Sequence, residues 1–427
     1  MIYSLLNLYF KNLILLRFRD VFYFWGFEIT FISLNLIFLN LFVTFIIVLR
    51  RFSFLSERKF LRNLIFLRII ILILFFRVDS VINFYFFMEF SLVPVFFIVL
   101  GWGYQPERLR AGIWIFLYTV LSAIPFFFLF FYYIKTFHIR EFSILRILAL
   151  KTANYFRIIE FFLILGFLVK FPIYLLHIWL PRAHVEAPLI GSVVLAAVLL
   201  KLAGFGIIKF SHLLVSKNLL NFLKLFCLGG GVYVRVICLL EKDIKKLIAY
   251  SSVGHIRFVI LSLGIKNFLG LKGGFLFMIT HGIRSSVLFI GSYYIYINSQ
   301  SRSLIINFRF LSYWPIFTFF WFLSNLAGIR APPRGSFFRE IFCLMRSFSL
   351  NLNFFFFFVL ILFLCVGYSI VLFRITQYGQ RVRDKFYLLD SVKFINLRVH
   401  SFIVFFFVFI LSVVYLFSII VYIKLQI

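Results

Sequence analysis

Two neighbouring apolar stretches within residues 161–210 constrain this chain most, because each is long enough to cross a bilayer and each carries one lysine near its middle. These lysines are Lys170 and Lys201. An ammonium group at membrane depth costs several kcal/mol unless it meets a counter-charge or water, so such a lysine points to function. Pro172 lacks an N–H and predicts a helix break just after Lys170. Broken helices with ionisable groups near the midplane line the ion paths of transporters.

The link between the two stretches, residues 177–188, is rich in polar residues and prolines. We expect it to be non-helical, with His177, His184 and Glu186 shaping the loop. The His184–Glu186 spacing is also found in zinc deaminases, but no matching cysteine pair follows, so that chemistry is not supported. Gly204 and Gly206 are expected to loosen the helix just after Lys201.

The composition excludes a soluble fold. The chain has 427 residues, of which 64% are hydrophobic, and its mean hydropathy is +1.08. At roughly 20 residues for each crossing, it predicts an all-α polytopic membrane protein with about 13 transmembrane helices. We interpret the 68 phenylalanines as lipid-facing side chains. The four cysteines are scattered through apolar stretches, so we expect no metal site and no disulfide framework.

The net charge of +30 is unusual for such a chain. Interfacial lysines and arginines that attract anionic lipid, such as cardiolipin, are one explanation. Contact with acidic partner subunits is another. The basic residues are spread over many short loops, so we expect no nucleic-acid binding.

The order of the apolar stretches predicts four regions. They are N-terminal transmembrane helices at 1–80, a first half-channel repeat at 81–210, a second at 219–373, and a basic loop with a last transmembrane helix at 374–427. Pro332 and Pro333 predict a second broken helix within the span near 312–346. One broken helix in each half is typical of an inverted repeat. Within the first half, between the spans near 111–134 and 156–180, residues 142–149 predict a short amphipathic helix at the membrane interface.

Other charges inside predicted spans extend the path from the two lysines. Glu89 needs a nearby cation to remain ionised, and Lys170 is the natural one. We hypothesise that this pair opens and closes, which would change how readily Lys170 releases its proton. A static ion pair is the alternative. Two nearby lysines lower each other's proton affinity, so Lys170 and Lys201 could share a proton.

Three further groups belong to the second half. His255 and His281 are candidate relays, although each could instead be a core residue that hydrogen-bonds a backbone carbonyl. Glu340 could take protons at the far end, although Arg339 and Arg346 flank it as they would a helix-end carboxylate. Asp243, Lys245 and Lys246 are expected to form a short charged loop.

Several segments resemble the antiporter-like proton-pumping subunits of respiratory NADH:ubiquinone oxidoreductase, most closely the mitochondrially encoded subunit 4 type. They are YQPERL (104–109), HIWLPRAHVEAP (177–188), DIKKLIAYSSVGHI (243–256), MITHGIRSSVLF (278–289) and NLAGIRAPPRGSFFREI (325–341). The resemblance covers roughly residues 81–345. The first 80 residues and the last 80 or so match only as apolar spans.

The resemblance implies a multi-pass protein of the mitochondrial inner membrane that provides one proton path, driven by NADH oxidation and ubiquinone reduction elsewhere in complex I. By matching motifs, the path residues are Glu89, Lys170, Lys201, His255, His281 and Glu340. No cofactor is expected on this chain, since FMN, iron–sulfur clusters and ubiquinone belong to partner subunits. The partners would be other membrane-arm subunits, including neighbouring antiporter-like ones. The alternatives are a cation/proton antiporter subunit and a structural scaffold with a closed channel.

Five arginines depart from the family pattern, which has small, hydroxyl or apolar residues there: Arg257, Arg284, Arg330, Arg334 and Arg339. A fixed cation beside a proton path raises the barrier to another cation. Three explanations are open. The arginines pair with acids of neighbouring subunits, or local water compensates them, or the codons are read differently in the organelle, for instance as serine.

Overall fold

The computed structural model describes residues 22–24, 27–50, 59–137, 141–142, 165–211, 217–263, 268–308, 310–329 and 352–378. Of the predicted elements, the spans near 3–16 and 399–424 lie outside these ranges, as does the second proline break at Pro332 and Pro333. The predicted interfacial helix near 142–149 is described only at its first residue.

The first half begins with two short strands and continues as helices. The elements are β1 (Phe22–Phe24), β2 (Phe27–Ile29), α2 (Phe31–Arg50), α3 (Lys59–Arg77), α4 (Val81–Phe90), α5 (Leu92–Trp102) and α6 (Arg108–Phe137). The strands pair antiparallel, with Tyr23 opposite Glu28. The prediction of a purely α-helical chain was therefore wrong at this point. Residues with aromatic rings or a branched β-carbon favour extended backbone, which explains a strand pair here.

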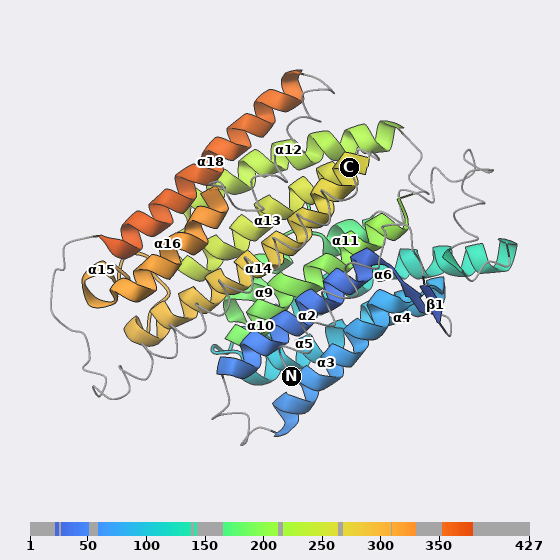
Figure 1. Cartoon of the computed structure of the whole chain (residues 1–427), viewed down its shortest axis with the longest axis horizontal. Coiled ribbons are helices and arrows are strands. Elements are labelled where there is room, and N and C mark those ends of the chain that lie inside the picture. Colours follow the sequence, from blue (N-terminus) through green and yellow to red (C-terminus); the bar gives the residue numbers. More distant parts are fainter. Residues whose placement is uncertain are drawn as a thin grey trace.

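The remaining elements carry the predicted path residues. They are α9 (Trp179–Glu186), α10 (Leu189–Val194), the π-helical turn η1 (Leu195–Leu199), α11 (Leu200–Lys209), α12 (Lys217–Leu240), α13 (Ile244–Leu263), α14 (Phe268–Ser299), α15 (Phe310–Tyr313), α16 (Pro315–Ile329) and α18 (Leu352–Gln377). Figure 1 shows most of the long helices lying side by side. The green α9–α11 segment lies between the blue helices and the yellow-to-red ones.

Seven helical segments of the described ranges are long and apolar enough to cross a membrane. The segment Leu189–Lys209 is 100% buried within the chain, whereas Phe355–Gln377 at the periphery is 33% buried. The lysine-bearing segment of α10, η1 and α11 therefore forms the centre of the bundle. Helices α3 and α13 lie in the predicted regions 1–80 and 219–373, and both carry several charged residues.

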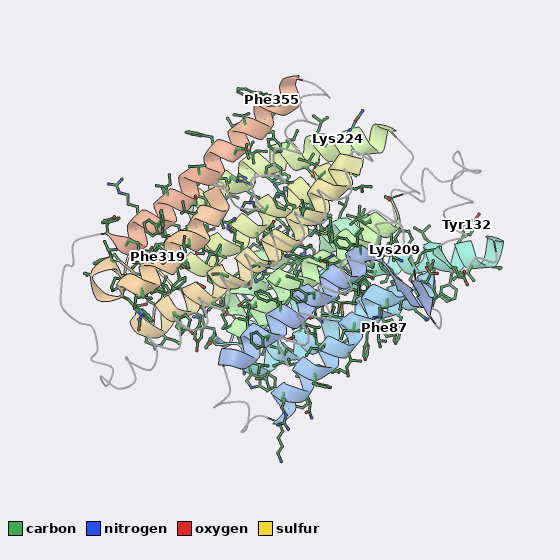
Figure 2. The ribbon with its side chains drawn as sticks, in the orientation of Figure 1. Phe87, Tyr132, Lys209, Lys224, Phe319 and Phe355 are labelled. Atoms are coloured by element: carbon green, nitrogen blue, oxygen red, sulfur yellow. The ribbon has the colours of Figure 1, made fainter. Side chains whose placement is uncertain are left out.

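Phenylalanine has two roles in the bundle. Many of its rings are exposed on outer helices, as expected for lipid-facing positions; Phe319 on α16 is 58% exposed (Figure 2). Others build the core. Phe84, for example, packs against Phe75 and Phe205 with ring centroids 4.7 and 6.3 Å apart. The interpretation of phenylalanine as lipid-facing was therefore incomplete, because aromatic pairs also stabilise the contacts between α3, α4 and α11.

The link between the lysine stretches is partly helical, which corrects the expectation of a non-helical loop. Residues 171–178 form turns, but α9 follows directly. Pro181 lies in the first turn of α9, where a backbone N–H has no intrahelical acceptor, so its ring does not interrupt the helix. Pro94 occupies the same position in α5. The span that contains Glu89 is accordingly interrupted at Ser91, between α4 and α5.

Gly204 and Gly206 do not loosen α11, which is a regular helix from Leu200 to Lys209. Instead they admit neighbouring side chains. A Cβ at Gly204 would lie 3.3 Å from the ring of Phe171 and would overlap the sulfur of Met278, and one at Gly206 would overlap the ring of Phe167. The two glycines thus bring the segment that carries Lys170 against the helix that carries Lys201.

We predict that Gly206→Ala destabilises the protein by about 1–3 kcal/mol, because the added methyl group overpacks the contact with Phe167. Gly229→Ala in α12 is the matched control, since a Cβ there meets nothing within 4 Å. The control should be neutral or slightly stabilising, because alanine favours the helix. Thermal inactivation of the membrane-extracted protein measures both effects. Equal midpoints for the two variants would contradict the packing assigned to Gly206.

Candidate proton path

Glu89 and Lys170 form a direct ion pair and hydrogen bond between α4 and the helical residues 165–170. The side chain of Lys170 is 7% exposed and that of Glu89 is 23% exposed. Opposite charges in contact remove most of the cost of holding an ammonium inside the bundle. The geometry agrees with the hypothesised pair.

The helix ends at Lys170 because the next turn contains Pro172. The carbonyl of Leu168, which Pro172 cannot pair with, accepts from the N–H of Ile173 at 3.4 Å. The indole Nε1 of Trp179 donates to the carbonyl of Val169 at 3.1 Å. These two contacts replace part of the lost helical bonding and hold Lys170 at the end of a helix.

Lys201 is the second residue of α11 and lies two residues after the end of the π-helical turn η1. A π turn leaves carbonyls without the usual partner four residues on, and such turns often mark functional sites. The amine of Lys201 donates to the carbonyl of Ala196, within that turn, at 2.5 Å. It also lies 3.1 Å from Nδ1 of His281 in α14. Lys201 is 1% exposed, so its proton exchanges only with groups inside the bundle.

His281 connects Lys201 to His255. The two imidazole rings, from α14 and α13, have centroids 5.8 Å apart and planes inclined by 45°. Both histidines are buried, at 4% and 1% exposure. The structure therefore brings Lys201, His281 and His255 together in one series across α11, α14 and α13.

Two groups that the sequence did not single out as path residues extend this series into α18. Nε2 of His255 lies 3.1 Å from the hydroxyl of Tyr368, and that hydroxyl lies 3.2 Å from Sγ of Cys365. Cys365 and Tyr368 are three residues apart and so share one face of α18. A neutral hydroxyl in an apolar span does not stand out in the sequence as a charged residue does. The i, i+3 spacing of Cys365 and Tyr368 could nevertheless have indicated a polar face on this helix.

Glu340, the predicted far end of the path, lies outside the described residues, as do Arg330, Arg334 and Arg339. The remaining departures from the family pattern are described. Arg284 in α14 is 7% exposed, and its Nη1 lies 2.5 Å from Nε2 of His255. Arg257 in α13 is 1% exposed, and its guanidinium lies 5.9 Å from the centre of the Tyr174 ring.

A polar cleft of about 670 Å³ lies beside the link. Among its lining residues are Glu107, Arg182, Glu186, Asp243 and Arg302. Glu186 forms an ion pair with Arg302 at 3.7 Å. Burial raises the pKa of Glu186, and the charge of Arg302 opposes that rise.

Lys245 connects α13 to the link, residues 177–188, by hydrogen bonds. The expected charged loop at 243–246 is in fact the first turn of α13, and only Asp243 precedes the helix. The amine of Lys245 donates to the carbonyls of Val185 and Ala187 at 3.0 and 2.6 Å. These carbonyls lie at the C-terminal end of α9, where a cation is favoured by the helix dipole.

Within the described residues, no group of three or more histidines, cysteines or carboxylates is placed to hold a metal ion. Cys227, Cys238 and Cys365 are buried free thiols. Cys343 lies outside the described residues. The ionisable groups gathered in this part of the chain are amines, imidazoles, a phenol and a carboxylate.

Comparison with known proteins agrees with this geometry. A family model described as "NADH:quinone oxidoreductase/Mrp antiporter, TM" matches residues 78–365. The chain is 35% identical to NADH-ubiquinone oxidoreductase chain 4 of Ceratitis capitata, over 86% of this chain and 82% of that one. It is 40% identical to the protein of that name from Artemia franciscana, over 73% and 78%.

Two solved structures share the fold at low sequence identity. One is respiratory complex I from Thermus thermophilus with bound NADH, with a TM-score of 0.77 and 19% identity, covering 93% of this chain and 87% of that chain. The other is the membrane-bound sulfane sulfur reductase, an archaeal respiratory membrane complex, with a TM-score of 0.79 and 16% identity, covering 92% and 82%. The antiporter-like fold and the identity to curated relatives lead to one conclusion: this chain belongs to the NADH-ubiquinone oxidoreductase chain 4 family of complex I membrane subunits.

Proposed function

We propose that this chain carries protons through the membrane arm of NADH:ubiquinone oxidoreductase along Glu89, Lys170, Lys201, His281, His255 and Glu340. The observation that supports this most is the series from Lys201 to Tyr368: Lys201 lies 3.1 Å from His281, the rings of His281 and His255 are 5.8 Å apart, and His255 lies 3.1 Å from Tyr368. Each member can both accept and release a proton, and each is buried from solvent. Tyr368 joins the path as an additional relay.

The ion pair controls the path. While Glu89 contacts Lys170, the two charges cancel and Lys201 is not repelled. When the carboxylate moves away, Lys170 keeps an uncompensated positive charge beside the helix of Lys201. The ammonium of Lys201 then gives its proton to Nδ1 of His281, and the proton passes to His255. Lys201 becomes neutral and is ready to accept the next proton.

The finer architecture follows the same proposal. The chain crosses the membrane about 13 times as an inverted repeat with two broken helices. It resides in the mitochondrial inner membrane, since the relatives with which it shares 35–40% identity come from animals. Its partners are other membrane-arm subunits, including antiporter-like ones. FMN, iron–sulfur clusters and ubiquinone are bound by other subunits of the complex, and the basic surface of this chain binds anionic lipid such as cardiolipin.

One observation favours a different function. Arg284 places a guanidinium 2.5 Å from His255, and a fixed cation there opposes the arrival of a proton. A subunit whose channel is closed in this way would serve as a structural scaffold of the membrane arm. A cation/proton antiporter subunit is the alternative within the same superfamily, and the family model covers both kinds of protein.

The test compares two buried lysines of one helix. Lys201→Met should lower quinone-linked proton pumping by about 10-fold or more, because a relay that accepts and releases the proton is lost. Lys209→Met, eight residues further along α11, should pump close to the unchanged rate. Lys209 is also buried, at 6% exposure, but its amine lies beside the rings of Phe142 and Phe205 at 5.1 and 5.8 Å.

Pumping is measured in inner-membrane vesicles as acidification per NADH oxidised, with the amount of assembled complex as the control. Glu89→Gln in the same assay separates a working ion pair from a static one. Normal pumping by Lys201→Met at normal assembly would contradict the proposed path and leave the scaffold function standing.

A further inference from the structure

Arg235 and Arg257 lie deep inside the bundle, on neighbouring helices α12 and α13. Each is 1% exposed. None of their six guanidinium nitrogens has a hydrogen-bond partner among the described residues. The ion pairs found in the described ranges are Lys170–Glu89, Lys246–Glu241 and Arg302–Glu186, so neither arginine has a carboxylate there.

Each guanidinium group lies beside an aromatic ring. Arg235 lies 5.3 Å from the centre of the Phe258 ring, and Arg257 lies 5.9 Å from that of Tyr174. A desolvated cation–π contact is worth about 2 kcal/mol. An unpaired charge inside a membrane bundle costs several kcal/mol, and arginine cannot escape that cost by losing its proton. Two such groups on neighbouring helices therefore destabilise the fold.

Burial also weakens two of the three explanations of the unusual arginines. An acid on a neighbouring subunit cannot reach side chains that this chain itself covers. Little space remains for water beside Arg257. A Cβ added to Gly230 would lie only 2.6 Å from Nη1 of Arg257, so this nitrogen lies against the backbone of Gly230. The remaining explanation concerns which residue is made at these positions.

A serine at position 235, 257 or 284 would be small, neutral and able to hydrogen-bond within its own helix. The buried serines of α13 and α14 each donate to the carbonyl three residues earlier, at 2.6–3.1 Å: Ser251, Ser252, Ser262, Ser285, Ser286 and Ser292. A serine at 235, 257 or 284 would reach the carbonyls of Val232, Gly254 or His281 in the same way. Such a hydroxyl is satisfied inside its own helix and needs no external partner.

We infer that the protein made in the organelle carries serine at positions 235, 257 and 284, because the codons that standard translation reads as arginine are read there as serine. The inference rests on the proposed mitochondrial location. It has a functional consequence at position 284, where the fixed cation beside His255 would be replaced by a neutral hydroxyl. The obstacle that favours the scaffold function would then be absent.

Peptide mass spectrometry of the natural complex tests this inference. The peptides that cover α12, α13 and α14 should have the masses of serine at 235, 257 and 284. Arg302 is the internal control and should be found as arginine, because it forms an ion pair with Glu186. Arginine masses at 235 and 257 would overturn the inference. They would leave the proton path untouched, since Lys201→Met tests that path separately.

His184 carries a second, independent inference. Its ring in α9 is fully buried and stacks on Phe289 with centroids 4.7 Å apart and planes 14° apart. Neither ring nitrogen has a hydrogen-bond partner among the described residues. A buried polar group without a partner costs free energy, so a use for those nitrogens is expected.

Lys245 lies next to His184, because its amine donates to the carbonyl of Val185 at 3.0 Å and it lines one pocket together with Phe289, on which His184 stacks. Burial, followed by the charges of Lys245 and Lys201, lowers the pKa of His184 to about 3. The ring is therefore neutral at physiological pH, with one N–H and one free lone pair. Lys245 is half-buried and lines a smaller pocket with Tyr104 and Arg302, and Arg302 also lines the polar cleft.

We propose that His184 and Lys245 exchange protons at the edge of the polar cleft, and so supply the path with protons. One ring nitrogen accepts a proton as the other releases its own, so the ring is neutral again after each transfer. This proposal rests on the proposed function and adds a route from the path to water.

His184→Phe tests the proposal, because a phenyl ring retains the stacking on Phe289 but exchanges no proton. Pumping per NADH should fall by about 10-fold or more. His177→Phe is the matched control, since His177 is also buried in the link, beside Tyr174 and Tyr250. It should pump close to the unchanged rate.

Lys245→Met should reproduce the loss seen with His184→Phe, and His184→Gln serves where the phenylalanine variant does not assemble. Unchanged pumping by assembled His184→Phe or His184→Gln, with Lys201→Met inactive, would overturn this proposal alone. Unchanged pumping by Lys201→Met as well would instead overturn the proposed function.

Discussion

The cost of holding an ammonium group inside a membrane bundle is the constraint on which the rest of this structure depends. For Lys170, the ion pair with the carboxylate of Glu89 offsets this cost. Lys201 offsets it by hydrogen bonds with the carbonyl of Ala196 in the π turn and with the imidazole of His281. The two solutions differ in kind. A carboxylate neutralises the charge, whereas a carbonyl and an imidazole nitrogen accept hydrogen bonds from the ammonium without neutralising it.

The backbone around the two lysines positions their side chains for these contacts. Pro172 ends one helix at Lys170, and Ser91 separates α4 from α5 two residues after Glu89. Each member of the ion pair thus lies near a helix end, where the chain has more freedom than in a continuous helix. Gly204 and Gly206 let the segment of Lys170 pack closely on α11. Interrupted helices and close packing together place ionisable groups at the centre of an otherwise apolar bundle.

Charges within apolar stretches are what the sequence predicts well. The Glu89–Lys170 contact follows from the need of each charge for an opposite one, and the approach of His281 to Lys201 agrees with the family motif. Groups without a charge signal were missed. Tyr368 and Cys365 are neutral and sit in a long apolar helix, so only the folded arrangement of α13 and α18 brings them to His255. The π turn was also missed, because its stretch LAAVL reads as ordinary helix.

The central claim is that these buried groups form one connected proton route, and water-resolving electron cryo-microscopy of the intact complex tests it most directly. The account predicts ordered water that joins His255 and Tyr368 to Glu340 and continues the contacts from Lys201. A dry, apolar gap between Tyr368 and Glu340, with the side chain at position 284 filling the space beside His255, would contradict it.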